Sequence, residues 1–140
     1  TFHVYDSFQG LPEKREQDQS PAGEQFKAGE LSVSKSDFIR NFKAAHLSLP
    51  TIHKAWFEDL SHEDVPAGIS FAFLDGDYYS SVRTPLALIT PHLLPGAVIV
   101  VDDYANEALP GARRAVDEWM KGRPAWRLRQ QSSLAIIHTP

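Results

Sequence analysis

The sequence predicts an α/β protein built on a doubly wound, mostly parallel sheet. Two continuous apolar runs, residues 69–74 (ISFAFL) and 97–101 (AVIVV), are typical of strands that are covered on both faces. Between them, residues 79–94 carry apolar side chains at helical spacing, and Pro95-Gly96 is expected to end that helix. The alternation of strand and helix favours parallel strands joined by right-handed crossovers, with helices on both faces of the sheet.

Ordinary helix and strand signals place the other elements. Ser36 is the expected N-cap of one helix, and Pro110 and Gly122 are the expected start and stop of another. In chain order, the additional elements are a strand over residues 2–5 that ends at Asp6, a long surface loop over 7–23, a helix over 36–45, a strand over 49–57 that ends at Glu58-Asp59, a helix over 110–121, and strands over 126–130 and 134–138.

Composition limits the class of protein. A chain of 140 residues, 42% hydrophobic and 23% charged, predicts a single domain over residues 1–140. A net charge of −4 argues against nucleic acid as a partner, because binding phosphates requires a surplus of Lys and Arg. There is no cysteine, no apolar run of membrane-spanning length and no signal peptide, so we expect a cytoplasmic protein without a membrane partner. Because Thr1 leads almost directly into a strand, we expect a fragment.

Acidic residues follow several of the predicted strands. Asp75 follows one apolar strand and Asp102-Asp103 follow the other, while Asp6 and Asp59 follow two more. The carboxyl ends of parallel strands meet at one edge of a sheet, where ligands bind, so these side chains should converge there. Gathered carboxylates repel one another unless a hard cation such as Mg²⁺ neutralises them. The alternative is that each Asp only caps the turn or helix that follows it.

Several segments resemble the macrocin O-methyltransferase family. The first is FLDGDYYSSVRTPLALITPHLLPGAVIVVDDY, which PGARRAVDEW follows; VYDSFQGLP and HKAWFEDL resemble the motifs of two earlier strands. The resemblance implies a class I methyltransferase fold, S-adenosylmethionine as the methyl donor, and a hydroxyl acceptor on a small molecule, a sugar or a natural-product glycoside. It also implies Asp75, Asp102 and Asp103 as ligands of Mg²⁺ and Asp77 as the general base.

The same resemblance implies the cofactor site. An acid at the end of the second strand of the family binds the ribose hydroxyls, and residues after its third strand lie by the adenine. The cofactor-binding residues implied here are Asp6, Ser7, Phe57, Glu58 and Asp75. The glycine-rich turn of the fold and the first strand that precedes it are missing, so we expect a sheet truncated at the N-terminus. We therefore expect weak S-adenosylmethionine binding by this chain alone, or completion by another chain, for instance in a homo-oligomer.

Two other functions compete with this interpretation. FAFLDGD and VIVVDD match the D-x-D start and the late acid pair of haloacid-dehalogenase-like, Mg²⁺-dependent phosphatases, with Asp75 as nucleophile and Asp77 as acid/base. The interval from Asp77 to Asp103 is too short for the intervening motifs of those enzymes, which favours the methyltransferase. The other alternative is a methyltransferase remnant that is non-catalytic or is completed by a partner, favoured by the missing glycine-rich turn.

Overall fold

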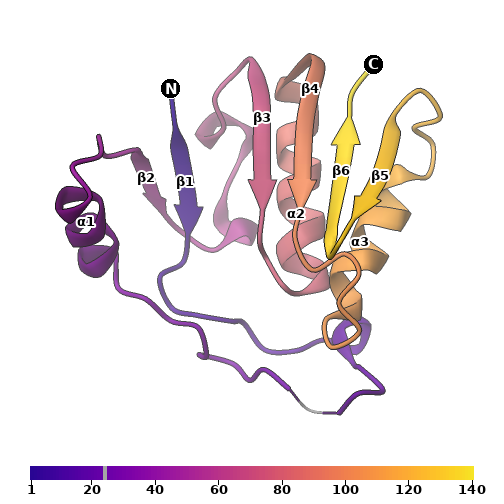
Figure 1. Ribbon diagram of the computed structural model, residues 1–140, viewed down its shortest axis with the longest axis horizontal. Coiled ribbons are helices and arrows are strands. Elements are labelled where there is room, and N and C mark those ends of the chain that lie inside the picture. The colour runs from indigo at the N-terminus through magenta and orange to yellow at the C-terminus, as the bar shows by residue number, and fades with distance from the viewer. Residues whose placement is uncertain (24) are drawn as a thin grey trace. The chain divides into compact units, whose positions relative to one another are not determined.

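The computed structural model describes residues 1–23 and 25–140 and divides the chain into two compact units. The first unit comprises Thr1–Glu13 and Phe26–Leu60, and the second comprises Lys14–Gln25 and Ser61–Pro140. Each unit contains its own sheet, one of two strands and one of four (Figure 1). The long loop predicted over residues 7–23 is therefore shared between the units.

The first unit contains two parallel strands and one helix. Strand β1 (His3–Asp6) pairs with β2 (Thr51–Lys54), with His3 opposite Thr51 and Asp6 opposite Lys54. Helix α1 (Lys35–Ala44) begins after Ser34, whose hydroxyl accepts a hydrogen bond from the Asp37 amide at 3.1 Å. Ser34 is thus the N-cap in place of the predicted Ser36. A short 3₁₀ turn, η2 (Phe57–Asp59), occupies residues that were predicted to end and follow the strand.

The second unit has a mixed sheet with the strand order β3-β4-β6-β5. Strand β3 (Ile69–Leu74) runs parallel to β4 (Leu93–Val101), whereas β6 (Leu134–His138) is antiparallel to both β4 and β5 (Arg127–Gln131). The prediction of a mostly parallel sheet was wrong here. The reason is that only a tight turn joins β5 to β6, and a connection that short can only produce an antiparallel pair.

Both long helices of the second unit lie on one face of its sheet (Figure 1). Helix α2 (Tyr79–Ile89) and helix α3 (Pro110–Met120) pack together there. They cover a core that includes Val82, Leu86, Ile99, Val116, Trp119 and Ile137. On the opposite face, Phe71 and Phe73 of β3 are 60% and 51% exposed. Within the described residues, helices on both faces of this sheet, and a β3 strand covered on both faces, were incorrect expectations.

Proline placement explains where α2 ends. The helix was predicted to continue to Leu94, but it ends at Ile89 and gives way to a 3₁₀ turn, η4 (Thr90–His92). Pro91 has no amide hydrogen to continue the helical ladder and its ring clashes with the preceding turn. The chain then enters β4 at Leu93, which pairs with Ile69, so Pro95-Gly96 lies inside an irregular first part of that strand. Among the described residues, no helix is long and apolar enough to cross a membrane.

Candidate active site

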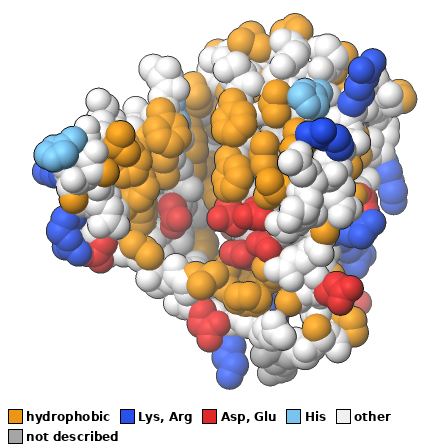
Figure 2. Space-filling view, viewed as in Figure 1, with side chains coloured by type: hydrophobic (Ala, Val, Ile, Leu, Met, Phe, Trp, Pro, Cys, Tyr) orange, Lys and Arg blue, Asp and Glu red, His pale blue; other side chains and the backbone are white. Residues whose placement is uncertain are grey.

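Three carboxylates gather where β3 and β4 end. The two strands are parallel neighbours with Leu74 opposite Val101, so the residues that follow them emerge side by side. Asp75, Asp77 and Asp103 each offer a carboxylate oxygen, and these oxygens all lie within 4.8 Å of one another. Figure 2 shows acidic side chains gathered at the border of the four-stranded sheet, next to its apolar face. The structure therefore brings together three of the four aspartates that the sequence singled out in this unit.

The loops that carry these carboxylates have an unusual backbone. Asp77 and Asp103 both adopt left-handed conformations, with φ of 59° and 56°. Such a conformation is costly for most residues but is tolerated by Asp, and it occurs often at functional sites. A Cβ on Gly76 would lie 2.3 Å from the carbonyl oxygen of Ser81, so only glycine fits between Asp75 and Asp77. The D-G-D sequence thus folds back tightly and directs two carboxylates to one place.

Crowding raises the pKa of two of these groups. Desolvation is the main reason that the pKa of Asp77 rises from 3.8 to about 7, and the negative charges of Asp75 and Asp103 and a hydrogen bond to Asp103 add to it. The pKa of Asp75 is raised too, chiefly by desolvation against neighbouring protein and then by the charges of Asp102 and Asp103, although this residue keeps access to solvent. Near neutral pH, Asp77 of the metal-free cluster is therefore still partly protonated, unlike an isolated carboxyl group.

Asp102 has different partners from the three clustered aspartates. Its Oδ1 accepts hydrogen bonds from the Asp103 amide at 2.8 Å and from the Ser133 hydroxyl at 3.2 Å. Its charge is near enough to help raise the pKa of both Asp75 and Asp77. Asp103 in turn accepts a hydrogen bond from the Asn106 side-chain amide at 2.8 Å. Sequence reasoning missed Asn106 and Ser133, although the close spacing of Asp103 and Asn106 offered a local signal for the first.

A buried aspartate supports the loop of Asp75 and Asp77 from a distance in sequence. Asp18 lies in the short 3₁₀ turn η1 (Glu16–Asp18) and is only 2% exposed. Its Oδ1 accepts a hydrogen bond from the Tyr79 amide, the first residue of α2, at 2.6 Å. The sequence indicated only a solvated loop here, because no local pattern links residue 18 to residue 79.

The residues implied for cofactor binding belong to the first unit, apart from Asp75. Asp6 ends β1 and accepts a hydrogen bond from the Phe8 amide at 2.6 Å, and the buried Ser7 hydroxyl accepts one from the Gln9 amide at 3.1 Å. Phe57 and Glu58 lie together in η2, shortly after the end of β2. Asp6 is the last residue of β1 and Phe57 comes shortly after β2, and these two strands are parallel partners. The Ala55 amide donates a hydrogen bond to the Asp6 carbonyl at 3.1 Å. Their role in binding a cofactor stays a prediction.

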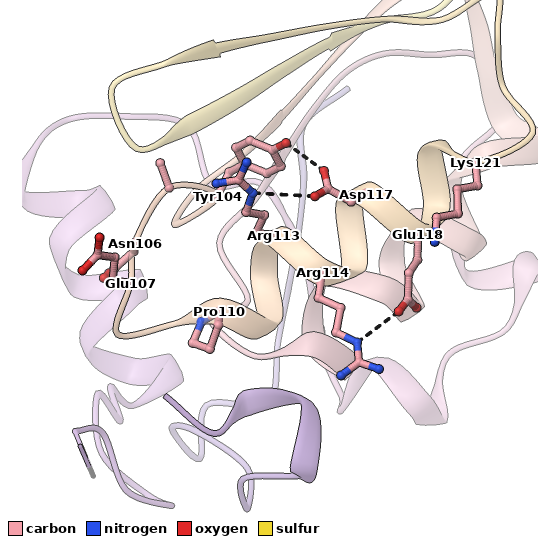
Figure 3. Close-up of a pocket in the computed structure, with 10 residues that line it drawn as sticks. Tyr104, Asn106, Glu107, Pro110, Arg113, Arg114, Asp117, Glu118 and Lys121 are labelled. Atoms are coloured by element: carbon pink, nitrogen blue, oxygen red, sulfur yellow. Dashed lines mark hydrogen bonds and ion pairs between the residues drawn. The ribbon is translucent and has the colours of Figure 1, made fainter. Parts of the chain in front are cut away.

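An open depression of about 410 Å³ lies along the outer side of α3 (Figure 3). Arg113 approaches Asp117 at 3.6 Å and lies over the ring of Tyr104, while Arg114 pairs with Glu118 at 3.0 Å. The three clustered carboxylates are not among its lining residues. Since these cations already have carboxylate partners, the depression offers no unbalanced charge for a ligand.

Comparison with solved structures defines the class of protein. The O-methyltransferase NovP superposes with a TM-score of 0.77 at 27% identity, over 98% of this chain and 59% of that one. The calicheamicin methyltransferase CalS11 gives a TM-score of 0.76 at 19% identity, over 97% of this chain and 59% of that one. The fold is therefore of the methyltransferase type, with an acidic cluster at the carboxyl ends of two neighbouring strands.

Sequence comparison identifies the family within that class. The family model of macrocin-O-methyltransferase (TylF) matches residues 1–125, and the chain belongs to this family. Demethyldecarbamoylnovobiocin O-methyltransferase of Streptomyces niveus is 31% identical over 126 residues, which are 85% of this chain and 47% of that protein. A tetracenomycin-C rhamnosyl 4'-O-methyltransferase of Streptomyces olivaceus is 30% identical over 126 residues, 86% of this chain and 46% of that protein. The chain thus spans about half the length of these curated relatives.

Proposed function

We propose that this chain is the catalytic part of a metal-dependent O-methyltransferase that uses S-adenosylmethionine to methylate a hydroxyl group of a small molecule. The observation that carries the proposal is the cluster of Asp75, Asp77 and Asp103, within 4.8 Å, in a member of the macrocin O-methyltransferase family. The family membership favours methyl transfer over the phosphatase chemistry that the same D-x-D pattern would allow. A sugar hydroxyl on a natural-product glycoside is the acceptor class that the relatives support.

The donor set of the cluster fits a hard divalent cation. Carboxylate oxygens are the ligands that Mg²⁺ prefers, and a cation would relieve the repulsion that adds to desolvation in raising the pKa of Asp75 and Asp77. The proposed ligands are Asp75 and Asp103 of the cluster together with Asp102, which lies outside the 4.8 Å group. When bound, Mg²⁺ would supply Lewis-acid stabilisation of negative charge on the acceptor oxygen.

Asp77 is the proposed general base. Its carboxyl group is half-buried beside Asp75 and Asp103, and its pKa of about 7 without a metal lies near the value at which a general base is most effective. It would accept the proton of the acceptor hydroxyl as the oxygen attacks the methyl group, while the bond from that methyl group to the sulfonium sulfur breaks and S-adenosylhomocysteine leaves. The two loops would then hold acceptor and base in place, and such positioning contributes much of the rate in a bimolecular transfer.

The cofactor would be held chiefly by the first unit. We propose that Asp6 and Ser7 bind the ribose and that Phe57 and Glu58 lie by the adenine, with Asp75 at the reacting end. We also propose that residues 1–140 belong to one domain and that the first strand of its fold lies outside this sequence. Supporting this, β1 pairs only with β2 and β3 only with β4 among the described residues. A second copy of the chain could supply the strand in a homo-oligomer, and the cytoplasm remains the proposed location.

Metal binding by matched variants tests the roles of the aspartates. We expect Asp103→Asn to weaken Mn²⁺ binding, measured by isothermal titration, at least ~10-fold, because metal sites lose that much when even an outer partner is removed. Asp77→Asn should keep the Mn²⁺ affinity and lower methyl transfer to a rhamnosyl glycoside by about 10²–10⁴-fold, the usual contribution of a general base. Loss of Mn²⁺ affinity in Asp77→Asn, with Asp102→Asn unaffected, would instead make Asp77 a ligand and refute the proposed roles.

A non-catalytic remnant is the alternative function, favoured by the lack of a glycine-rich turn in this sequence. A remnant would form an assembly that neither Mg²⁺ nor S-adenosylmethionine alters. Size-exclusion chromatography with and without both additives distinguishes the two. A methyl-transferring protein should in addition lose its activity in EDTA and regain it with Mg²⁺.

A further inference from the structure

We propose that Asp18 is a positioning residue for the acidic cluster, holding the loop from Asp75 to Tyr78 through a helix cap supplied from far along the chain. Asp18 is 2% exposed, and among the described residues no other charged side chain belongs to the buried set. Burying a carboxylate costs free energy unless the group is paired or hydrogen-bonded, so the buried Asp18 carboxylate should have specific hydrogen-bond donors.

The first partner is the N-terminus of α2. Tyr78 precedes this helix, but its side chain makes no capping hydrogen bond. Asp18 Oδ1 accepts the Tyr79 amide at 2.6 Å instead, over a separation of 61 residues. Free amides at a helix N-terminus carry partial positive charge, so a carboxylate is the group that satisfies them best. The cap fixes the point at which the loop of Asp75 and Asp77 enters the helix.

Asp18 also lies in close contact with the N-terminal turn of α3. Leu109 makes no side-chain cap there either. A Cβ on Gly111 would lie 1.9 Å from Asp18 Oδ1 and 2.7 Å from the Tyr79 amide nitrogen, so only a glycine leaves room for the carboxylate between the two helices. One buried side chain therefore caps the start of α2 and packs against the start of α3, the helices that follow the two loops of the cluster.

The segment around Asp18 makes further contacts with the same two loops. The Lys14 ammonium lies 6.0 Å from the ring centroid of Tyr78, which adjoins Asp77. The Ser20 hydroxyl donates to the Glu107 carbonyl at 2.7 Å, next to Asn106, whose amide binds Asp103. In Figure 1, η1 lies beside the N-terminal end of α3, consistent with these contacts. The cluster is thus supported through residues that never join it.

Hydrogen exchange and metal binding together test the proposal, and only the metal part rests on the proposed function. In Asp18→Ala, we expect the Tyr79 amide to lose most of its protection, residues 76–79 to exchange faster, and the Mn²⁺ affinity to fall about 10-fold, as for outer-shell partners of metal sites. Asp18→Asn keeps an oxygen for Tyr79 and should restore both readouts to within about 3-fold of the wild type. Asp64→Ala, which removes an aspartate cap of the 3₁₀ turn η3 (His62–Asp64), is the matched control and should change neither.

The outcomes separate the two proposals. Unchanged exchange at residues 76–79 in Asp18→Ala overturns the positioning role, as does faster exchange with an unchanged Mn²⁺ affinity. If the wild type binds no Mn²⁺, the proposed metal site fails, and the exchange data alone decide whether Asp18 holds the loop. If Asp18→Ala does not fold, Asp18→Ser is the second variant, because its hydroxyl is one atom too short to hold the Tyr79 amide at the observed distance. That variant should give the same loss at Tyr79, and normal Tyr79 protection would contradict the proposal.

Discussion

At the scale of single residues, Asp77 combines two features that usually occur separately. It lies in a left-handed backbone conformation and has a strongly raised carboxyl pKa, and both follow from the tight turn that Gly76 permits. The turn brings Asp77 beside Asp75 and Asp103. The three carboxyl groups are so close that ionising all of them would cost electrostatic free energy. An acidic cluster of this kind lowers stability and needs a compensating function or cation.

The raised carboxyl pKa values predict how stability depends on pH. In metal-free protein, Asp77 has a pKa of about 7 when folded and 3.8 ordinarily, so between these values the folded state binds more protons than the unfolded state. Stability should therefore fall as pH rises from about 5 through 7, and Asp75 contributes in the same direction. Thermal unfolding in EDTA at pH 5.5 and pH 8 measures this effect.

Two controls accompany the pH experiment. Asp77→Asn removes the titrating group, so in EDTA at pH 8 this variant should melt at a higher temperature than the wild type. Mg²⁺ should raise the melting temperature of the wild type more at pH 8 than at pH 5.5, because the cation competes with protons for the same oxygens. A melting temperature that rises steadily with pH in EDTA would contradict the assigned pKa shifts.

At the scale of elements, the packing of α2 against α3 determines how firmly the loops are held. Trp119 of α3 is 1% exposed, and its indole donates a hydrogen bond to the Thr90 hydroxyl at 3.2 Å, just past the end of α2. Its ring meets that of Trp126 edge-on at 5.0 Å, and the Arg123 guanidinium lies over it at 4.3 Å. Trp119 therefore joins both helices to the chain that leads into β5.

Truncating this side chain should weaken the second unit strongly. We expect Trp119→Ala to lower the free energy of unfolding by about 3–5 kcal/mol, the usual cost of removing a large buried aromatic side chain. Urea denaturation followed by circular dichroism measures the loss. Trp126→Ala is the control, because Trp126 is only half-buried and its removal should cost clearly less. If both variants lost the same free energy of unfolding, the deeper burial of Trp119 would not be the reason for its contribution.

At the scale of the whole molecule, the described residues form two compact units, each with a sheet of its own. The relatives continue well beyond the matched region, since this chain covers 47% of the novobiocin-pathway enzyme and 59% of the NovP structure. The proposed cofactor residues lie mainly in one unit, and the proposed metal and base residues lie in the other.

We predict that residues 1–140 alone bind the cofactor weakly. We expect isothermal titration with S-adenosylmethionine to give an affinity no better than millimolar, because the glycine-rich turn that binds the methionine end in the family has no counterpart in this sequence. Mn²⁺ binding should persist in the same sample, since its proposed ligands belong to a single unit. Micromolar affinity for S-adenosylmethionine would refute the incomplete cofactor site.

Local sequence was enough to determine the apolar strands and the acids that follow them. Residues 69–74 were predicted with their observed bounds, because a continuous apolar run can be recognised within a short segment. Asp75 and Asp103 were placed at a common edge, because each follows a strand of one strand-helix-strand unit and such strands run parallel. The antiparallel pairing of β6 with β4 and the position of both helices on one face were not predicted, since they depend on pairing and packing between distant segments. The early end of α2 follows from Pro91, a local signal that the prediction missed.

The tertiary structure alone decided the electrostatics and support of the site. The pKa of Asp77 depends on desolvation and on charges from another strand, and the burial of Asp18 depends on a glycine in α3 and an amide in α2. No periodic pattern encodes such contacts, because each joins residues that become neighbours only after the chain has folded. The sequence thus determined which residues carry the acidic chemistry, and folding determined which of them share protons and what holds them in place.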